Sequence, residues 1–464
     1  MKRGYRVERD YLGSKKINNK YYYGVQTKRA LDNFKVSGLH LQKGLIYSIA
    51  LIKKATTISN LKEKRLNYKI GKAIIKACDD ILKGKLDNQF LVDVYQAGAG
   101  TSENMNLNEV IANRALEILK KRKGSYNIIN PNDHVNLSQS TNDIFHSAIH
   151  LAAYKEIKNE LLPALINLEK ELNKKAIKWN HVIKSGRTHL RDAVPISLGQ
   201  EFSAYAETIR KDGKHVEEDY SKLLEINMGG TAIGSGLNAT KKYQRNVIKE
   251  INKLTRSKFR HSRNLFEGTQ SLDAILATSA SLKILATNLI KIANDLRLLS
   301  SGPITGLNEI TLPTVQPGSS IMPGKVNPAI AEMLDMVCFQ VIGNDTTIVM
   351  CGQAGQLELN VMMPLAAYNL INSIEILSNG INIFTEKCVK GIKANEKKCL
   401  EYIEKNPIII TALTPYIGYS KAAEIAKRAY KEEKSVRQLV LESNLLDKKT
   451  LDKALNIKKM IKIW

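Results

Sequence analysis

Apolar residues recur along most of the chain at the three-to-four-residue spacing of an amphipathic helix. Ile70, Ile74 and Ile81 fall on one face of a predicted helix that ends at Gly84. The same spacing predicts a second helix over residues 111–119. The alternation of Val or Ile with polar residues that is typical of a sheet core does not occur in the sequence. We therefore expect an all-α fold.

Longer stretches keep the helical pattern for many turns. The clearest of them, residues 271–300, contains no Gly or Pro and would span roughly 45 Å as one helix. The others are 142–180 with an interruption at Pro163, 197–227, 328–349 with Pro328 at its first position, and a helix from about 357 with a break at Pro364. Apolar residues cover more than one face of several stretches, which indicates helices buried on several sides of a bundle.

Polar and glycine-rich segments separate these helices. Residues 1–40 show no regular pattern, so we expect them to be irregular, and we expect Arg187–Pro195 to be a polar turn. From about Cys388 the sequence changes to short lysine-rich segments. The chain length and these breaks predict three domains, which are an N-terminal domain of residues 1–141, a central helical bundle of residues 142–393 and a small C-terminal domain of residues 394–464.

The formal net charge of +25 raises the question of nucleic-acid binding. The lysines are spread over nearly every predicted helix, for example at Lys72, Lys155 and Lys241, and aromatic residues make up only 6% of the chain. The sequence has no basic–aromatic interleaving and no zinc-finger spacing. The charge is therefore better explained by solvated lysines, and we expect no nucleic-acid partner.

The length of the apolar runs, the first ten residues and the spacing of the cysteines indicate where in the cell the protein is found. No window holds eighteen consecutive apolar residues, and the first ten residues lack the apolar segment of a signal peptide. The five scattered cysteines never form a CxxC pair, which argues against a zinc site or a disulfide framework: Cys78, Cys338, Cys351, Cys388 and Cys399. We expect a cytoplasmic protein with no membrane span.

Candidate chemistry lies in four polar loops, Gly100–Asn104, Ser138–Asn142, Gly186–His189 and Gly318–Pro328. They offer hydroxyls, amides, an imidazole and an ammonium group, which suit a small substrate with carboxylates. Each residue alone has a plainer explanation. Thr141 and Asn142 are also good helix caps, and His189 alone would be a structural histidine. Lys325 alone would be a surface lysine, and Glu332 would only complement the dipole of the helix that follows Pro328.

Three common motifs do not fit these loops. Gly318–Lys325 has one residue too many for a P-loop, and Val326 stands where that motif needs Ser or Thr. Gly98–Gly100 lacks the preceding strand of a dinucleotide-binding fingerprint. Gly318–Ser320 does not have the spacing of a hydrolase nucleophile elbow.

The stretch Gly318–Pro328, GSSIMPGKVNP, resembles the signature of the aspartase/fumarase superfamily. Segments similar to that family cover nearly the whole chain: 6–10, 22–27, 106–110, 186–189, 295–303 and 417–442. Three short motifs resemble its aspartases more than its class II fumarases: GTS at 100–102, STND at 140–143 and YYG at 22–24.

The resemblance implies three-domain, all-α subunits that form a homotetramer, with active sites that use loops from three chains. Ser319 would act as an alkoxide base and take a proton from the carbon beside the substrate's β-carboxylate. The implied catalytic residues are Ser319, His189 and Glu332. The implied substrate-binding residues are Thr101, Ser140, Thr141, Asn142, Thr188, Ser320, Lys325 and Asn327. Glu332 would orient His189 and raise its basicity.

The expected reaction is the reversible deamination of L-aspartate to fumarate and ammonia. The alternative within the family is the class II fumarase reaction, L-malate to fumarate and water, because His189 with Glu332 suits either leaving group. A third reading is a basic binding protein that has kept the lyase scaffold without activity. We expect no metal site and no required cofactor. Some family members are activated by Mg²⁺, and the sequence leaves this open.

Four positions depart from the family pattern without removing a proposed catalytic group. They are Ala97, Arg191, Ile304 and Met363. We expect any effect of Arg191 or Ile304 on rate or specificity to come through altered loop packing near the site.

Overall fold

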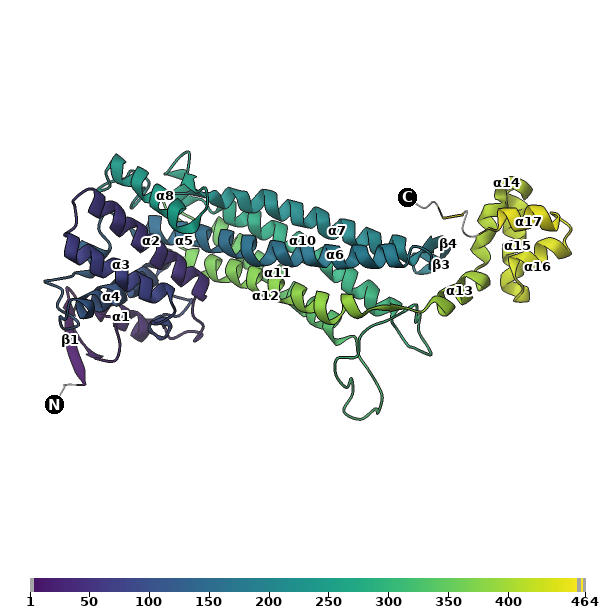
Figure 1. Cartoon of the computed structure of the whole chain (residues 1–464), viewed down its shortest axis with the longest axis horizontal. Helices are drawn as coiled ribbons and strands as arrows, with labels where there is room; N and C mark the ends of the chain where they lie inside the picture. Colours follow the sequence, from purple (N-terminus) through teal and green to yellow (C-terminus); the bar gives the residue numbers. More distant parts are fainter. Residues whose placement is uncertain (1–3, 457–459, 462–464) are drawn as a thin grey trace. The chain divides into compact units, whose positions relative to one another are not determined.

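The computed structural model describes residues 4–456, 460 and 461. It is mostly helical (Figure 1). Its strands form four small two-stranded sheets. This confirms the all-α class predicted from the spacing of apolar residues. The outermost residues of the predicted first and last domains, 1–3 and 462–464, lie outside the described residues, as do 457–459.

The chain divides into two compact units, each made from three separate segments. Unit 1 comprises Met1–Pro163, Lys214–Ala286 and Phe339–Ser378. Unit 2 comprises Ala164–Gly213, Thr287–Cys338 and Asn379–Trp464. The predicted domain boundaries follow the linear sequence instead, and they stay a prediction.

Unit 1 contains the N-terminal elements and the glycine-rich region that follows residue 214. Its strands and α-helices are β1 (Tyr5–Asp10), β2 (Gly13–Asn18), α1 (Val25–Asn33), α2 (Lys43–Lys62), α3 (Tyr68–Leu82), α4 (Thr101–Ile118), α5 (Thr141–Glu156), β5 (Glu225–Ile226), α8 (Lys241–Thr255), β6 (Arg260–His261) and α9 (Glu267–Gln270). Its single turns of 3₁₀ or π type are η1 (Asp87–Gln89), η2 (Gly98–Gly100), η3 (Pro131–Val135), η4 (Ile157–Leu161) and η5 (Ser221–Leu224).

Unit 2 contains the helix that follows Pro163, a hairpin and the C-terminal helices. Its elements are α6 (Leu162–Lys178), β3 (Ile183–Thr188), β4 (Arg191–Ser197), β7 (Ile310–Thr311), η6 (Val389–Gly391), β8 (Lys393–Ala394), α13 (Glu396–Lys405), η7 (Pro407–Leu413), α14 (Thr414–Ile417), α15 (Tyr419–Glu432), α16 (Val436–Glu442) and α17 (Lys448–Ala454). The last of these pack around a small apolar core that includes Leu413, Leu439 and Leu451.

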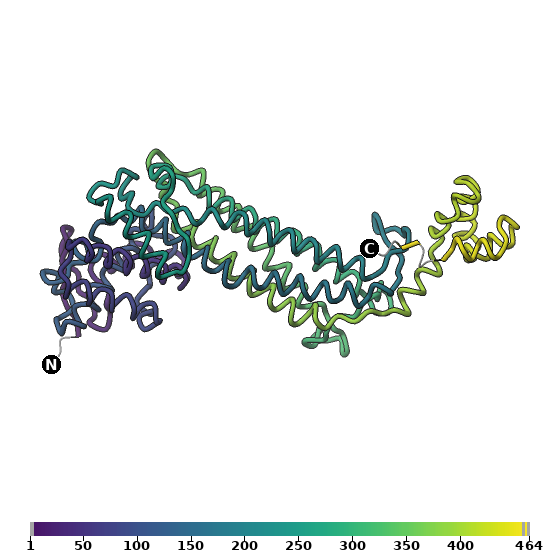
Figure 2. Tube along the Cα trace, turned by 45° about the horizontal axis from the view of Figure 1, so that its top comes forward, coloured from purple at the N-terminus to yellow at the C-terminus, as the bar shows by residue number. Residues whose placement is uncertain are grey.

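Four long helices pass through both units: α7 (Leu198–Tyr220), α10 (Asp273–Leu299), α11 (Ala329–Gln353) and α12 (Met363–Lys387). Within each unit, their segments run side by side in Figures 1 and 2. Polar contacts join them within each unit. In unit 2 the Tyr205 hydroxyl donates to Asp295 across 2.8 Å, and in unit 1 the Ser279 hydroxyl donates to Asp345 across 2.7 Å. The bundle predicted from the multi-faced apolar pattern is therefore present.

Helix α10 confirms the predicted uninterrupted helix over 271–300 to within two residues at its start and one at its end. Among the described residues it is the one helix whose length and hydropathy would allow it to cross a membrane, and half of its most apolar window is buried inside the chain. Core helices of bundles have the same composition, so the sequence of α10 by itself is weak evidence for a membrane.

Prolines end or start helices in places that differ from the predictions. The predicted interruption at Pro163 occurs one turn earlier, as the π-type turn η4 between α5 and α6. The predicted break at Pro364 was wrong. Helix α12 begins at Met363, so Pro364 lies in its first turn, where a missing N–H costs little. The helix predicted over 197–227 ends at Tyr220.

The expectation that residues 1–40 are irregular was wrong. Strands β1 and β2 form an antiparallel hairpin in which Tyr5 faces Asn18, and helix α1 follows. The residue before α1, Gly24, has no side chain to cap it. Glu109 of α4 supplies the cap instead, because its carboxylate accepts the N–H groups of Gly24, Gln26 and Thr27 at 2.7, 2.8 and 3.1 Å.

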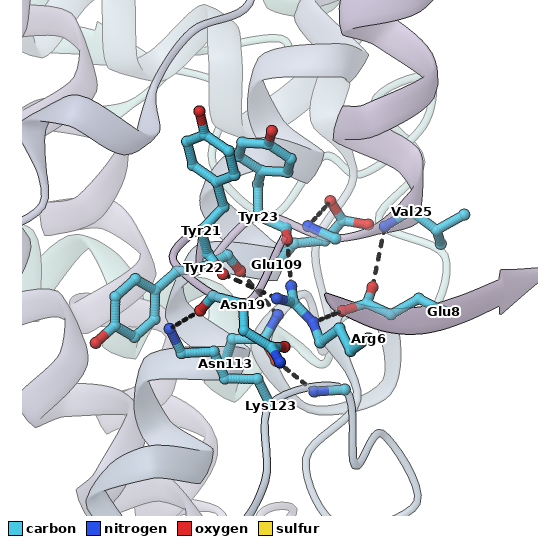
Figure 3. Close-up of polar contacts among 12 residues, drawn as sticks. Arg6, Glu8, Asn19, Tyr21, Tyr22, Tyr23, Val25, Glu109, Asn113 and Lys123 are labelled. Carbon is cyan, nitrogen blue, oxygen red and sulfur yellow. Dashed lines mark hydrogen bonds and ion pairs between the residues drawn. The ribbon is translucent and has the colours of Figure 1, made fainter. Parts of the chain in front are cut away.

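Arg6 completes this anchor, as Figure 3 shows. Its guanidinium group donates to Glu8 and to the backbone carbonyls of Tyr21 and Tyr23 at 2.6, 2.9 and 2.5 Å. Glu8 in turn accepts the N–H of Val25 at 3.0 Å. The N-terminal segment is therefore held by buried carboxylates and one arginine. Such polar contacts cannot be predicted from the spacing of apolar residues.

The predicted polar turn at Arg187–Pro195 was also wrong, because most of it is strand. Strands β3 and β4 pair antiparallel, and Thr188 lies opposite Arg191. Only His189 and Leu190 form the turn, with φ of 55° and 57°. A two-residue hairpin turn of this kind requires positive φ at both positions, which usually selects Asn and Gly. The turn therefore holds two side chains in a backbone conformation that L-residues rarely adopt.

A buried lysine organises the segment that leads into α5. Lys53 of α2 is fully buried, and its amine donates to the side-chain oxygens of Asn136 and Gln139 at 2.8 and 3.0 Å. The Asn136 oxygen also accepts from the amide of Asn108 at 3.2 Å. Burial lowers the pKa of Lys53 to about 7, and the nearby Asp143 opposes that shift. Both acceptors are neutral amides, so an uncharged amine satisfies them equally well.

Replacing Lys53 with methionine tests this state. The unfolded lysine keeps its proton up to about pH 10.4, whereas the folded one loses it near pH 7. Between these values the unfolded state binds more protons, so the free energy of unfolding rises with pH. We expect the wild type to gain about 1 kcal/mol per pH unit over Lys53→Met between pH 7 and pH 10. Urea denaturation across this range measures it, with substitution of exposed Lys72 as the control. A wild-type free energy of unfolding that falls relative to that of Lys53→Met as the pH rises would contradict the assignment.

Replacing Leu190 with glycine tests the strain in the hairpin turn. Leu190 is 75% exposed, so the change loses little burial, and glycine adopts positive φ without steric cost. We expect the free energy of unfolding to rise by about 1 kcal/mol. Val194→Gly is the matched control, because it removes an exposed side chain from the extended part of the same hairpin and should lower stability. Equal losses in both variants would show that the turn is unstrained.

Candidate active site

Two helix N-termini in unit 1 carry the first group of predicted site residues. Thr101 is the first residue of α4 and is exposed, and Thr141 is the first residue of α5 and is half-buried. The amide of Asn104, one turn into α4, donates to the Thr141 hydroxyl at 3.0 Å and links the two starts. Free N–H groups and the positive end of the helix dipole make such starts suited to a carboxylate.

The start of α5 is built differently from the capping expected of Thr141 and Asn142. Ser140 is the cap: its hydroxyl accepts the N–H of Asn142 at 3.3 Å, and Asp143 accepts the N–H of Ser140 at 2.9 Å. This reciprocal pair is a capping box. The side chain of Asn142 is therefore not used in capping, and it donates to the carbonyl of Ala232 at 2.7 Å.

Asp143 also fixes the glycine-rich loop beside this helix start. Its second oxygen accepts the N–H groups of Gly229 and Thr231 at 3.0 and 3.2 Å, and the side chain is fully buried. Burial raises the pKa of Asp143 to about 6, against the three backbone donors that favour its charged form. Asn227 adds a further tie, since its amide donates to the carbonyl of Asn142 at 3.2 Å.

Sequence reasoning missed the residues that hold this group in place. Lys53 and Asn136 contact the loops but lie outside any polar run that marked them. For Lys53 the only signal was its position between apolar and hydroxyl residues on α2, beside Lys54, which made it resemble a surface lysine. Its role becomes visible only when α2 packs against the segment 136–139.

The second group lies in unit 2 on the loop before α11. Ser319 is half-buried, and its hydroxyl oxygen accepts the N–H groups of Ile321 and Met322 at 3.2 and 2.9 Å. Two backbone donors aimed at one serine oxygen stabilise negative charge on it. The loop therefore provides the environment that a serine base needs, although a serine hydroxyl is a poor base in water.

Short-range contacts close the same loop. The N–H of Gly318 donates to the carbonyl of Lys325 at 2.8 Å, and the Asn327 amide donates to the carbonyl of Gly318 at 2.7 Å. A Cβ on Gly318 would lie 2.6 Å from the nitrogen of Asn327, so only glycine fits there. Ser320 and Lys325 are exposed. The loop that carries them is held in shape by the short-range hydrogen bonds of its own backbone and of Asn327.

The remaining predicted residues lie elsewhere in unit 2. Thr188 and His189 are exposed at the tip of the β3–β4 hairpin, and Glu332 lies half-buried in the first turn of α11. Within this described chain no hydrogen bond or ion pair joins His189 to Glu332. Their pairing stays a prediction, as do the roles of the residues in both groups.

The four departures from the family pattern occupy distinct places. Ala97 precedes the 3₁₀ turn η2, and Arg191 opens β4 directly after the strained hairpin turn. Ile304 is 90% exposed, whereas Met363 is fully buried at the start of α12. Arg191 is thus the departure that lies nearest His189 in the hairpin register.

Comparison with known proteins identifies the family of this chain. Residues 13–343 match the family described as Lyase, and residues 409–462 match the Fumarase C C-terminus. The aspartate ammonia-lyase of Bacillus subtilis is 49% identical over 458 residues, covering 99% of this chain and 96% of that protein. The class II fumarate hydratase of Helicobacter pylori is 44% identical over 457 residues, covering 98% and 99%. The crystal structure of class II fumarase from Schistosoma mansoni matches with a TM-score of 0.95 at 39% identity, covering 98% and 99%. The chain therefore belongs to the aspartase/fumarase superfamily and is a lyase.

Proposed function

We propose that this lyase is an aspartate ammonia-lyase, which converts L-aspartate reversibly to fumarate and ammonia. The observation that carries the proposal is the pair of backbone N–H groups on the Ser319 oxygen. They support an alkoxide at this position, and the chemistry requires a base that removes a weakly acidic proton from carbon.

In the proposed reaction, the Ser319 alkoxide takes a proton from Cβ of L-aspartate. The electron pair of that C–H bond moves into the β-carboxylate and forms a doubly charged aci-carboxylate. Hydroxyls and helix N-termini at Thr101, Ser140 and Thr141 suit this charge, because their donors face an anion without needing to reorganise. Collapse of the intermediate forms the C=C bond of fumarate and breaks the C–N bond, so that ammonia leaves with the bonding pair.

The other substrate carboxylate is assigned to Lys325 and Asn327. A lysine ammonium and an amide N–H are both donors, which suits a carboxylate that stays charged throughout the reaction. We assign four residues to the side of the site that faces the amino group of the substrate: His189, Glu332, Asn142 and Thr188. We propose no required cofactor.

The choice of ammonia over water as leaving group rests on short motifs and on the relatives. The GTS and STND motifs at 100–102 and 140–143 resemble aspartases. Aspartate ammonia-lyases match at 49% and 48% identity, and class II fumarate hydratases at 44% and 45%. This small margin makes fumarate hydratase the second candidate.

We further propose a homotetramer in the cytoplasm whose active sites combine loops of different chains. An apolar stripe along α11 supports an assembled state. Met336, Phe339 and Met350 are 63%, 58% and 55% exposed at helical spacing, although they lie on one of the long helices of the bundle. Exposed apolar surface of this kind is typical of an interface between subunits.

A parallel assay on two substrates tests the leaving group. Purified protein should produce fumarate from L-aspartate, measured by its ultraviolet absorbance, and should act on L-malate at least about a hundredfold less well in kcat/KM, a difference of about 2.7 kcal/mol. Strong conversion of malate with none of aspartate would make the protein a fumarate hydratase. No turnover of either acid, with salt-sensitive binding of nucleic acid, would favour the inactive basic binding protein.

Replacing Ser319 with alanine tests the base. We expect kcat to fall by about 10²–10⁴-fold, the usual contribution of a general base, while the assembly and the melting temperature stay unchanged. Thr314→Ala, which removes a hydroxyl from an exposed position earlier in the same loop, should keep full activity. Substantial turnover by Ser319→Ala would remove this serine from the role of base.

A further inference from the structure

Two histidines on α5 form a buried pair that the proposed reaction does not use. His146 and His150 lie one turn apart, and their side chains are 3% and 4% exposed. Their ring centroids are 4.8 Å apart, with an angle of 43° between the ring planes. Both belong to unit 1, as do all their contacts described here.

Each ring has one nitrogen within hydrogen-bond distance of a backbone carbonyl, and the carbonyl of Leu223 also acts on the His150 ring. His146 Nε2 lies 2.9 Å from the carbonyl oxygen of Ser271, and His150 Nδ1 lies 2.7 Å from that of Glu225. A carbonyl oxygen only accepts hydrogen bonds, so these two nitrogens carry the protons. The other two nitrogens, His146 Nδ1 and His150 Nε2, then carry lone pairs, and both are buried without a hydrogen-bond partner.

The rings stay neutral near pH 7. Burial lowers the pKa of His146 to about 4 and, together with His146, that of His150 to about 3. Two buried acceptors without partners on adjacent turns are costly to the folded state, which points to a missing binding partner.

A cavity of about 310 Å³ adjoins the pair. Besides the two histidines, its lining includes Lys222, Glu225, Arg260, Glu267 and Asp273. The two cations already have carboxylate partners, since Lys222 pairs with Asp219 at 2.9 Å and Arg260 with Glu225 at 2.9 Å. Glu267 and Asp273 add negative charge, so the cavity favours a cation over an anion.

Imidazole lone pairs at positions i and i+4 of one helix are a common arrangement for binding a divalent transition metal. Such nitrogen ligands suit Zn²⁺, Co²⁺ and Ni²⁺, whereas Mg²⁺ and Ca²⁺ prefer oxygen. Among the residues that the structure describes, no group of three His, Cys, Asp or Glu side chains is arranged to hold a metal. A site here would therefore have two protein ligands and take its other ligands from water in the cavity.

We propose that His146 Nδ1 and His150 Nε2 form a binding site for one divalent transition-metal ion of the zinc class. The site is separate from the proposed reaction and needs no substrate. Its binding is therefore measured without turnover, and its failure would leave the assignment of Ser319 unaffected.

Calorimetric titration of the full chain with Zn²⁺ tests the site, after removal of any affinity tag and of bound metal with a chelator. We expect one ion per chain, and an affinity at least about tenfold lower in His146→Leu and in His150→Leu, which fill the space of each ring without a lone pair. His261→Leu is the matched control, because His261 also has a buried nitrogen without a partner but no second imidazole on an adjacent turn. Its affinity should equal that of the wild type.

Two results would overturn the proposal: no binding to the wild type, or equal binding to the wild type and both α5 variants, which would indicate ions held at the surface only. If the leucine variants do not fold, a zinc-soaked crystal of the unaltered protein decides the matter. An anomalous difference peak within coordination distance of both rings supports the site, and the absence of such a peak contradicts it.

Discussion

The buried carboxylate of Asp143 sets the geometry on which the first half of the proposed site depends. It receives the N–H of Ser140 at the start of α5 and those of Gly229 and Thr231 in the glycine-rich loop. One side chain thus fixes where the helix begins and where the loop lies. The hydroxyls of Ser140 and Thr141 therefore project from a rigid helix start, and no large rearrangement is needed before an anion binds.

The loop that carries Ser319 obtains its order in another way. Its contacts are short-range backbone hydrogen bonds, and Ile321 is 84% exposed at its tip. Few buried apolar contacts restrain such a segment, so it belongs to the less stable parts of the molecule. The Ser319 loop is thus shaped locally by its own backbone, whereas the start of α5 is fixed by a buried carboxylate.

The sequence predicted those elements whose stability comes from long apolar periodicity. Helix α10 was placed nearly to the residue, because thirty residues without Gly or Pro leave few alternatives. The hairpin at 183–197 was missed, since its turn uses His189 and Leu190 in place of the usual Asn and Gly. The hairpin at 5–18 was missed because Arg6, Glu8 and Glu109 hold it, and such partners are distant in sequence.

Within the site, the same limit applies. The polar loops were visible because Gly and Pro punctuate them, and GSSIMPGKVNP identified the family. Lys53 and Asn136 were not visible, because their importance arises only from three-dimensional packing. The cap at Ser140 was misplaced by one or two positions, since several neighbouring residues have equal capping ability and only the position of Asp143 decides among them.

The division into units has a consequence for biosynthesis. Unit 1 begins with the first residues of the chain but is complete only when Phe339–Ser378 has been made. A ribosome therefore exposes its N-terminal part while a large share of that unit's apolar partners is still missing. Unfinished surfaces of this kind are where nascent chains aggregate or recruit chaperones. Unit 1 thus starts to be synthesised first but can be completed only after most of the chain has been made. Cutting the gene at a linear domain boundary would separate segments that belong to one compact unit.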